Sequence, residues 1–109
     1  MRRLLDTEQL NELKIVLEDD YPAFIDSFIL DTEKKLAQLQ VLLTQHSFRD
    51  GRDVAHSLKG SCLNLGAAEM AECCQRLQLI DSDSDSNAQI QLLQSTWADT
   101  KVQLSALII

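Results

Sequence analysis

Hydrophobic residues recur at spacings of three and four along most of the 109-residue chain, which is the period of an amphipathic α-helix. The pattern predicts five helices, over residues 7–19, 22–45, 47–66, 67–80 and 88–109. Because the connections between them are short, consecutive long helices should lie antiparallel. We therefore expect an all-α fold, an up-down antiparallel four-helix bundle whose one end is covered by the short N-terminal helix. With no internal repeat in the pattern, residues 1–109 are expected to form a single domain.

Each predicted helix carries an apolar stripe that should face the core. The stripe of the first helix is Leu10, Leu13 and Leu17. That of the second helix is Ile25, Phe28, Ile29, Leu36, Leu39 and Leu43. The fourth helix should bury Met70, Cys73, Cys74, Leu77 and Ile80, and the last should bury Ile90, Leu93, Trp97, Leu104 and Ile108.

Residues with helix-capping preferences mark the expected starts of three helices. Asp6 and Gln9 form a plausible capping pair for the first helix. Pro22 suits the first turn of the second helix, where its missing N–H has no consequence. Ser47 and Asp50 resemble a capping box for the third helix, with Asp in place of the usual Glu.

Two features indicate where helices end. Gly66 fits a left-handed cap at the end of the third helix, and Gly51 should weaken the first turns of that helix. Residues 81–87 read Asp-Ser-Asp-Ser-Asp-Ser-Asn, an acidic low-complexity run. The run lacks the spacing of an EF-hand loop, so we predict a solvated connection there rather than a metal site.

The third helix presents a core face and an exposed face. Its apolar stripe consists of Val54, Leu58, Cys62 and Leu65. At 100° per residue, His56 lies about 160° around the helix from both Val54 and Leu58. The imidazole of His56 is therefore expected to face solvent.

An exposed histidine is usually a solvated polar residue, but the residues around this one are unusual. Lys59 and Gly60 follow it by three and four positions, so they share its face of the helix. Gly60 should cost about 1 kcal/mol relative to alanine in a helix interior. Leu63, one heptad on, is an apolar residue on the exposed face, and Arg49 and Arg52 extend the face in the other direction as a basic stripe. Together these residues predict a docking surface.

Composition narrows the class of partner and the compartment. With 17 acidic and 10 basic residues, the chain has a formal net charge of −7, which disfavours nucleic acids and anionic membranes as partners. No apolar run reaches the roughly 18 residues of a transmembrane helix, and the N-terminus lacks the apolar core of a signal peptide. The three cysteines, Cys62, Cys73 and Cys74, form no even framework and are expected to be reduced and buried. We expect a cytoplasmic monomer.

Several kinds of chemistry are not supported by the sequence. It has no glycine-rich loop for nucleotide phosphates, no nucleophile elbow and no His/Cys cluster with zinc spacing, so neither a metal nor another cofactor is expected on this chain. Nucleophilic chemistry by a single imidazole remains, because an exposed imidazole is mostly neutral at pH 7 and has a free lone pair. Lys59 could then stabilise an added phosphoryl group.

The segment His56-Ser57-Leu58-Lys59-Gly60-Ser61, followed by Asn64-Leu65-Gly66-Ala67, resembles the signature of histidine-containing phosphotransfer (HPt) domains. The family pattern H-x-L-K-G, with a second glycine six residues later, is matched in full. The resemblance implies that His56 takes a phosphoryl group from the aspartate of a receiver domain and passes it to another receiver. It also implies that Lys59 assists the phosphorylated ring, that Gly60 leaves room for the receiver, and that the metal ion, Mg²⁺, belongs to the receiver.

The expected function is therefore that of a phosphorelay carrier without ATP-dependent kinase activity of its own. Its partners would be receiver domains of response regulators and hybrid sensor histidine kinases. Two alternatives remain: a helical module that binds and sequesters response regulators without accepting phosphate, and a structural bundle with an incidental motif. Transfer of a phosphoryl label from a receiver to His56 would distinguish the carrier from both.

Overall fold

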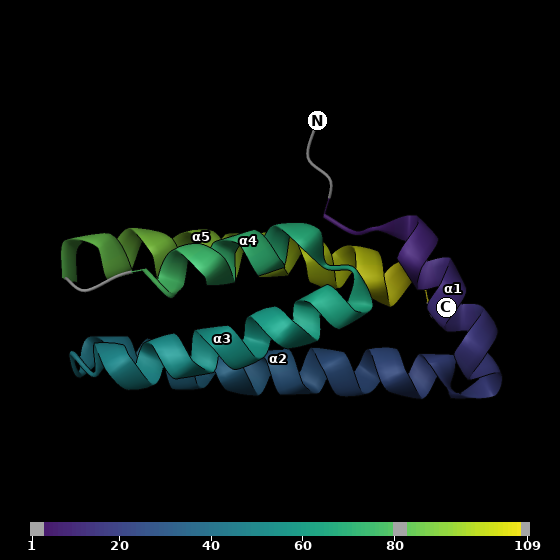
Figure 1. Cartoon of the computed structure of the whole chain (residues 1–109), viewed down its shortest axis with the longest axis horizontal. Helices are drawn as coiled ribbons and strands as arrows, with labels where there is room; N and C mark the ends of the chain where they lie inside the picture. Colours follow the sequence, from purple (N-terminus) through teal and green to yellow (C-terminus); the bar gives the residue numbers. More distant parts are fainter. Residues whose placement is uncertain (1–3, 80–82, 108–109) are drawn as a thin grey trace.

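A computed structural model of the protein describes residues 4–79 and 83–107. In it, four helices pack side by side through their apolar stripes. The helices are α1 (Thr7–Leu17), α2 (Tyr21–Thr44), α3 (Phe48–Leu65), α4 (Ala68–Leu77) and α5 (Asp83–Ala106), with a short 3₁₀ turn over Glu18–Asp20. Consecutive helices from α2 to α5 run antiparallel along the long axis of the molecule, and α1 crosses one end (Figure 1). The predicted all-α bundle with an N-terminal end helix is confirmed.

The core forms where the predicted stripes meet. Side chains that are fully buried include Ile25, Leu39, Leu58, Cys62, Leu65, Met70, Leu77, Leu93 and Leu104. Thr32, Thr96 and Thr100 are also fully buried, and they occupy core positions that a hydrophobic pattern does not register. The Thr100 hydroxyl donates a hydrogen bond to the Thr96 carbonyl at 2.7 Å, so this polar group is satisfied within its own helix.

The N-terminal segment is anchored to the end of α3. The Asp6 backbone N–H donates to the Gly66 carbonyl at 2.7 Å. The Gln9 side-chain amide donates to the carbonyls of Leu63 and Asn64, at 2.7 and 2.9 Å, which are among the last carbonyls of α3. Since terminal carbonyls of a helix have no partner within the helix, Gln9 caps α3 from another element.

Half of the capping pair predicted for α1 is confirmed. The Asp6 carboxylate accepts a hydrogen bond from the Gln9 backbone N–H at 3.2 Å. The Gln9 side chain turns instead to α3. The helix was predicted to reach residue 19 but ends at Leu17, because Glu18 leaves the helical conformation with φ of 51° and ψ of −117°. Pro22 lies in the first turn of α2, as predicted.

The capping box predicted at the start of α3 is wrong. Ser47 is the N-cap residue, but its side chain makes no capping hydrogen bond, and Asp50 is exposed. The prediction for Gly51 was also incomplete, since this residue is buried where α2 and α3 approach closely. A Cβ at Gly51 would lie 3.0 Å from a methyl carbon of Leu43.

The predicted boundaries near the acidic run need correction. α4 is shorter than the predicted 67–80, and α5 begins at Asp83, so residues 83–87 are helical rather than part of a loop. Aspartate and serine favour the first turn of a helix, where backbone N–H groups are unpaired and the helix dipole favours negative charge. The run therefore contains a helix start as well as a connection. Residues 80–82 and Ile108 lie outside the described residues.

The three cysteines are free and buried, as predicted. A hydrogen bond with Cys62 and burial raise the pKa of the Cys74 thiol, and burial raises that of Cys73. Both groups are therefore kept as neutral thiols, which are poor nucleophiles. None of the helices in the described part of the chain is long and apolar enough to cross a membrane.

Gly66 is expected to be required for stability. Its φ of +96° is a left-handed conformation, and an added Cβ would lie 3.3 Å from Asp6 and Gln9 atoms. Gly66→Ala should destabilise the fold by about 1–2 kcal/mol from the backbone conformation alone. Thermal unfolding followed by circular dichroism should show a fall of several degrees in Tm. An unchanged Tm would contradict the assigned cap.

Candidate functional site

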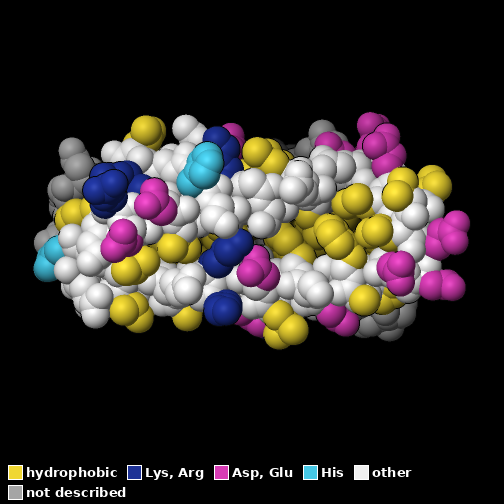
Figure 2. Space-filling view, turned by 60° about the horizontal axis from the view of Figure 1, so that its bottom comes forward, with side chains coloured by type: hydrophobic (Ala, Val, Ile, Leu, Met, Phe, Trp, Pro, Cys, Tyr) yellow, Lys and Arg dark blue, Asp and Glu magenta, His cyan; other side chains and the backbone are white. Residues whose placement is uncertain are grey.

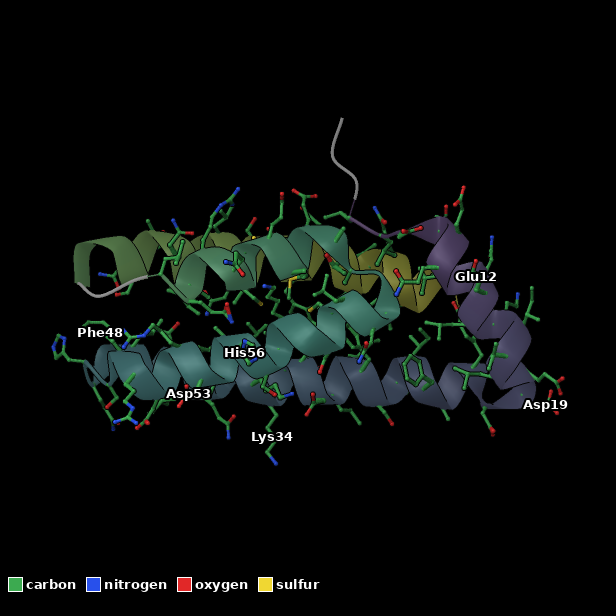
Figure 3. The ribbon with its side chains drawn as sticks, in the orientation of Figure 1. Glu12, Asp19, Lys34, Phe48, Asp53 and His56 are labelled. Carbon is green, nitrogen blue, oxygen red and sulfur yellow. The ribbon has the colours of Figure 1, made fainter. Side chains whose placement is uncertain are left out.

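His56 lies near the middle of α3 on the surface of the bundle, as Figure 3 shows. Its side chain is exposed, while the adjacent Ala55 and the nearby Leu58 are completely buried. The helix is thus fixed by its core face and presents the imidazole on the opposite side. The predicted orientation of His56 is confirmed by its exposure.

Gln78, which directly follows the last residue of α4, holds one of the two ring nitrogens of His56. Gln78 Nε2 lies 3.0 Å from His56 Nδ1. The amide can donate to Nδ1 through its nitrogen or, after a half-turn, accept from Nδ1–H through its oxygen. In both arrangements Nδ1 is engaged, and no hydrogen bond among the described residues occupies Nε2. Nε2 is therefore the ring nitrogen open to a partner.

A second glutamine, which lies within α4, holds Lys59. The Lys59 ammonium donates a hydrogen bond to the side-chain oxygen of Gln75. Lys59 is half-buried, although Gln75 is exposed. The lysine was predicted to share the exposed face with His56, and the structure shows it inclined towards α4. Its positive charge is kept one helical turn from His56.

The other predicted partner-binding residues share this face of α3. Gly60 and Arg49 are exposed, Arg52 is partly exposed, and Leu63 has 53% of its surface exposed. A Cβ at Gly60 would meet no atom within 4 Å, so the space above this residue is open. Figure 2 shows a histidine near basic and acidic side chains, with hydrophobic side chains over the whole face and their largest group in the half of the molecule farther from the histidines.

Gly66 is the remaining residue singled out by the sequence, and it has the predicted structural position. Its left-handed backbone ends α3, and its N–H donates to the Cys62 carbonyl at 2.9 Å. The turn directs α4 back along α3. It therefore brings α4 and its C-cap residue beside Lys59 and His56.

Gln75 and Gln78 are the site residues that the sequence analysis missed. His56 and Gln78 each lie eleven residues from Ala67, and Lys59 and Gln75 each lie eight from it. An antiparallel helical hairpin folded at Ala67 brings residues at equal distances from the turn side by side. The glycine cap at Gly66 located that turn, so the pairing could have been inferred from the sequence.

The arrangement suits nucleophilic attack by a neutral imidazole on a group delivered by another protein. The described residues contain no group of three or more His, Cys, Asp or Glu side chains that could hold a metal ion. The His56 side chain is exposed, so a second molecule would have to supply the walls that exclude water from the reaction site.

Comparisons with known proteins agree with this geometry. A crystal structure of histidine-containing phosphotransfer protein B (HptB) from Pseudomonas aeruginosa PAO1 is similar, with a TM-score of 0.89 and 29% sequence identity. That match covers 99% of this chain and 96% of HptB. A rice protein, provisionally named a histidine-containing phosphotransfer protein, has the same fold, with a TM-score of 0.87 and 19% identity, over 96% of this chain and 79% of its own.

No curated protein sequence matches the chain at a significant level. The family model for the Hpt domain matches residues 23–108, which include nearly all of α2, all of α3 to α5 and every residue of the candidate site. Since this match covers most of the chain, the protein belongs to the Hpt domain family.

Proposed function

We propose that His56 is the residue through which this Hpt domain, a histidine phosphotransfer protein of multistep phosphorelays, carries the phosphoryl group. The observation that supports this most directly is the state of the imidazole. It is exposed on α3, its Nδ1 is held by Gln78, and no hydrogen bond among the described residues occupies its Nε2.

In the proposed reaction the lone pair of His56 Nε2 attacks the phosphorus of a receiver's aspartyl phosphate. The N–P bond forms as the P–O bond to the aspartate breaks, and the aspartate leaves as a carboxylate. The ring gains positive charge and keeps its proton on Nδ1. Rotation of the Gln78 amide group by 180° exchanges its nitrogen and oxygen, and the oxygen can then accept a hydrogen bond from this N–H. Transfer to the next receiver is the same reaction in reverse.

Lys59 would stabilise the phosphoryl group during and after transfer. A phosphoryl group carries about −1.5 to −2 charges near pH 7. Two unit charges 4 Å apart interact by about 1 kcal/mol in water and about 4 kcal/mol at an effective dielectric constant near 20. The ammonium of Lys59 should therefore contribute most when a docked receiver has excluded water.

Receiver domains are partners of this family, and we propose that they dock over the face centred on His56. The open space at Gly60 allows close approach, and Leu63 offers apolar area next to it. We propose that Arg49 and Arg52 give this part of a protein of net charge −7 a local positive potential. Such a potential favours encounter with the acidic site of a receiver and makes the rate of encounter sensitive to salt.

The carrier is proposed to act as a cytoplasmic monomer of one domain, residues 1–109, with no cofactor of its own. Free, buried cysteines agree with a reducing compartment. The Mg²⁺ that phosphoryl transfer requires would be bound by the receiver. Neither nucleic acid nor membrane is proposed as a partner, because the net charge is strongly negative.

The experiment that tests the function is transfer from a phosphorylated receiver domain. The purified protein, mixed with a ³²P-labelled receiver and Mg²⁺, should acquire acid-labile and alkali-stable label. Binding without label transfer would support instead the alternative, a module that sequesters response regulators.

The protein should not phosphorylate itself from ATP. Nothing in the sequence provides a glycine-rich cradle for nucleotide phosphates. Incubation of the purified protein with γ-labelled ATP and Mg²⁺, without a receiver or kinase, should give no incorporation. Stoichiometric incorporation under these conditions would contradict the assignment as a carrier only.

A further inference from the structure

Two neutral amides, one in α4 and one at its C-cap, hold the two side chains of α3 to which the proposed function gives a role. Gln78, the C-cap residue, engages His56, and Gln75, three residues earlier in α4, engages Lys59. The H-x-L-K-G pattern includes Lys59, but it does not indicate which residue holds the Lys59 ammonium in position. Gln75 is the residue whose hydrogen bond does so.

An amide has a particular advantage at this position. A free lysine side chain has many rotamers, so its ammonium would rarely lie beside the ring. The oxygen of Gln75 restricts that motion without cancelling the positive charge of Lys59. A carboxylate in the same place would pair with the ammonium and compete with the incoming phosphoryl group.

We infer that Gln75 is a positioning residue, which holds the Lys59 ammonium beside His56 and leaves its charge available for the phosphoryl group. The inference rests on the proposed function, since it assigns Gln75 a role in the same transfer. Gln75 acts through Lys59 and need not contact the phosphoryl group itself.

The test is the single-turnover rate of transfer from a labelled receiver to variants of Gln75. Gln75→Leu, which removes the acceptor at similar size, should slow transfer by about three- to tenfold. Gln75→Glu should slow it by about tenfold or more, because the new carboxylate pairs with Lys59. Gln75 is exposed, so both variants should keep the native Tm.

A double-mutant cycle separates positioning from a general structural effect. The Lys59→Met variant should itself transfer slowly. Adding Gln75→Leu to it should not lower the transfer rate further, because Gln75 acts only through the lysine. Gln91→Leu, the same change at an exposed glutamine of α5, is the matched control and should transfer at the native rate.

The outcomes distinguish this inference from the proposed function. If the native protein accepts no label, the function itself is wrong. If the native protein accepts label but both Gln75 variants transfer at its rate, only the role of Gln75 is wrong. Equal losses from Gln75→Leu with and without Lys59 would also overturn that role, since they would show that Gln75 acts independently.

Discussion

His56→Gln should abolish phosphorylation of the protein by a phosphorylated receiver. The substitution keeps a polar, uncharged side chain at an exposed position of α3 but removes the nucleophilic ring nitrogen. Because the core face of the helix is untouched, Tm should stay within a few degrees of the native value. Acid-labile label on the protein, measured after incubation with ³²P-labelled receiver, should fall to background.

The other histidine provides the matched control for this experiment. His46 lies in the turn between α2 and α3, with a φ of 61° and its ring edge-on to Phe48 at a centroid distance of 6.1 Å. It has no lysine three residues later and no glycine four residues later. His46→Gln should therefore be labelled at the native level. Undiminished label on His56→Gln would contradict the assignment of His56.

The stripes of the bundle could be predicted because burial leaves a clear period in the sequence. Val54, Leu58 and Cys62 repeat at every fourth position, and this spacing alone places His56 on the opposite face of α3. The exposure of His56 and Gly60 in the structure follows from that geometry. The local hydrophobic pattern is therefore enough to predict which face of a helix a motif residue occupies.

Helix boundaries were less predictable where polar residues have two possible roles. Serine and aspartate favour loops and helix starts for the same reason, since their side chains hydrogen-bond to nearby backbone N–H groups. The run at residues 81–87 was therefore predicted to be a loop, although α5 begins within it at Asp83. Ser47 shows the converse, because it occupies an N-cap position without making a capping hydrogen bond.

The partners of His56 and Lys59 depend on tertiary pairing, which the pattern of a single helix does not contain and which only the turn at Gly66 indicates. Gln75 lies in α4 and Gln78 directly after its last residue, and from the sequence alone both are ordinary polar residues. They become part of the site only because the turn at Gly66 folds α4 against α3. A single left-handed glycine thus links the local helix signal to the arrangement of the site.

Gly60→Gln should leave the fold intact and greatly reduce phosphoryl transfer. A Cβ at this position meets no atom within 4 Å, so a larger side chain can be accommodated without displacing the core. Replacing a helix-interior glycine should stabilise the helix by up to about 1 kcal/mol, so Tm should be unchanged or slightly higher.

The expected loss of transfer follows from the geometry of the docked complex. The glutamine side chain would project beside His56, on the face over which the receiver is proposed to dock. Nucleophilic transfer requires the reacting atoms to lie about 3–3.5 Å apart, and a displacement of about 1 Å can slow it roughly 100-fold. Single-turnover transfer from a labelled receiver should therefore be slower by about two orders of magnitude.

Gly60→Ala is the matched control, because a single methyl group enters the same open space without reaching far above the helix. It should transfer much faster than Gly60→Gln, and its Tm should be equal or higher. The comparison separates loss of the glycine from obstruction of the receiver. If Gly60→Gln unfolded, or transferred at the native rate, then Gly60 would not lie in the surface that the receiver covers. The docking face would then have to be sought on another side of His56.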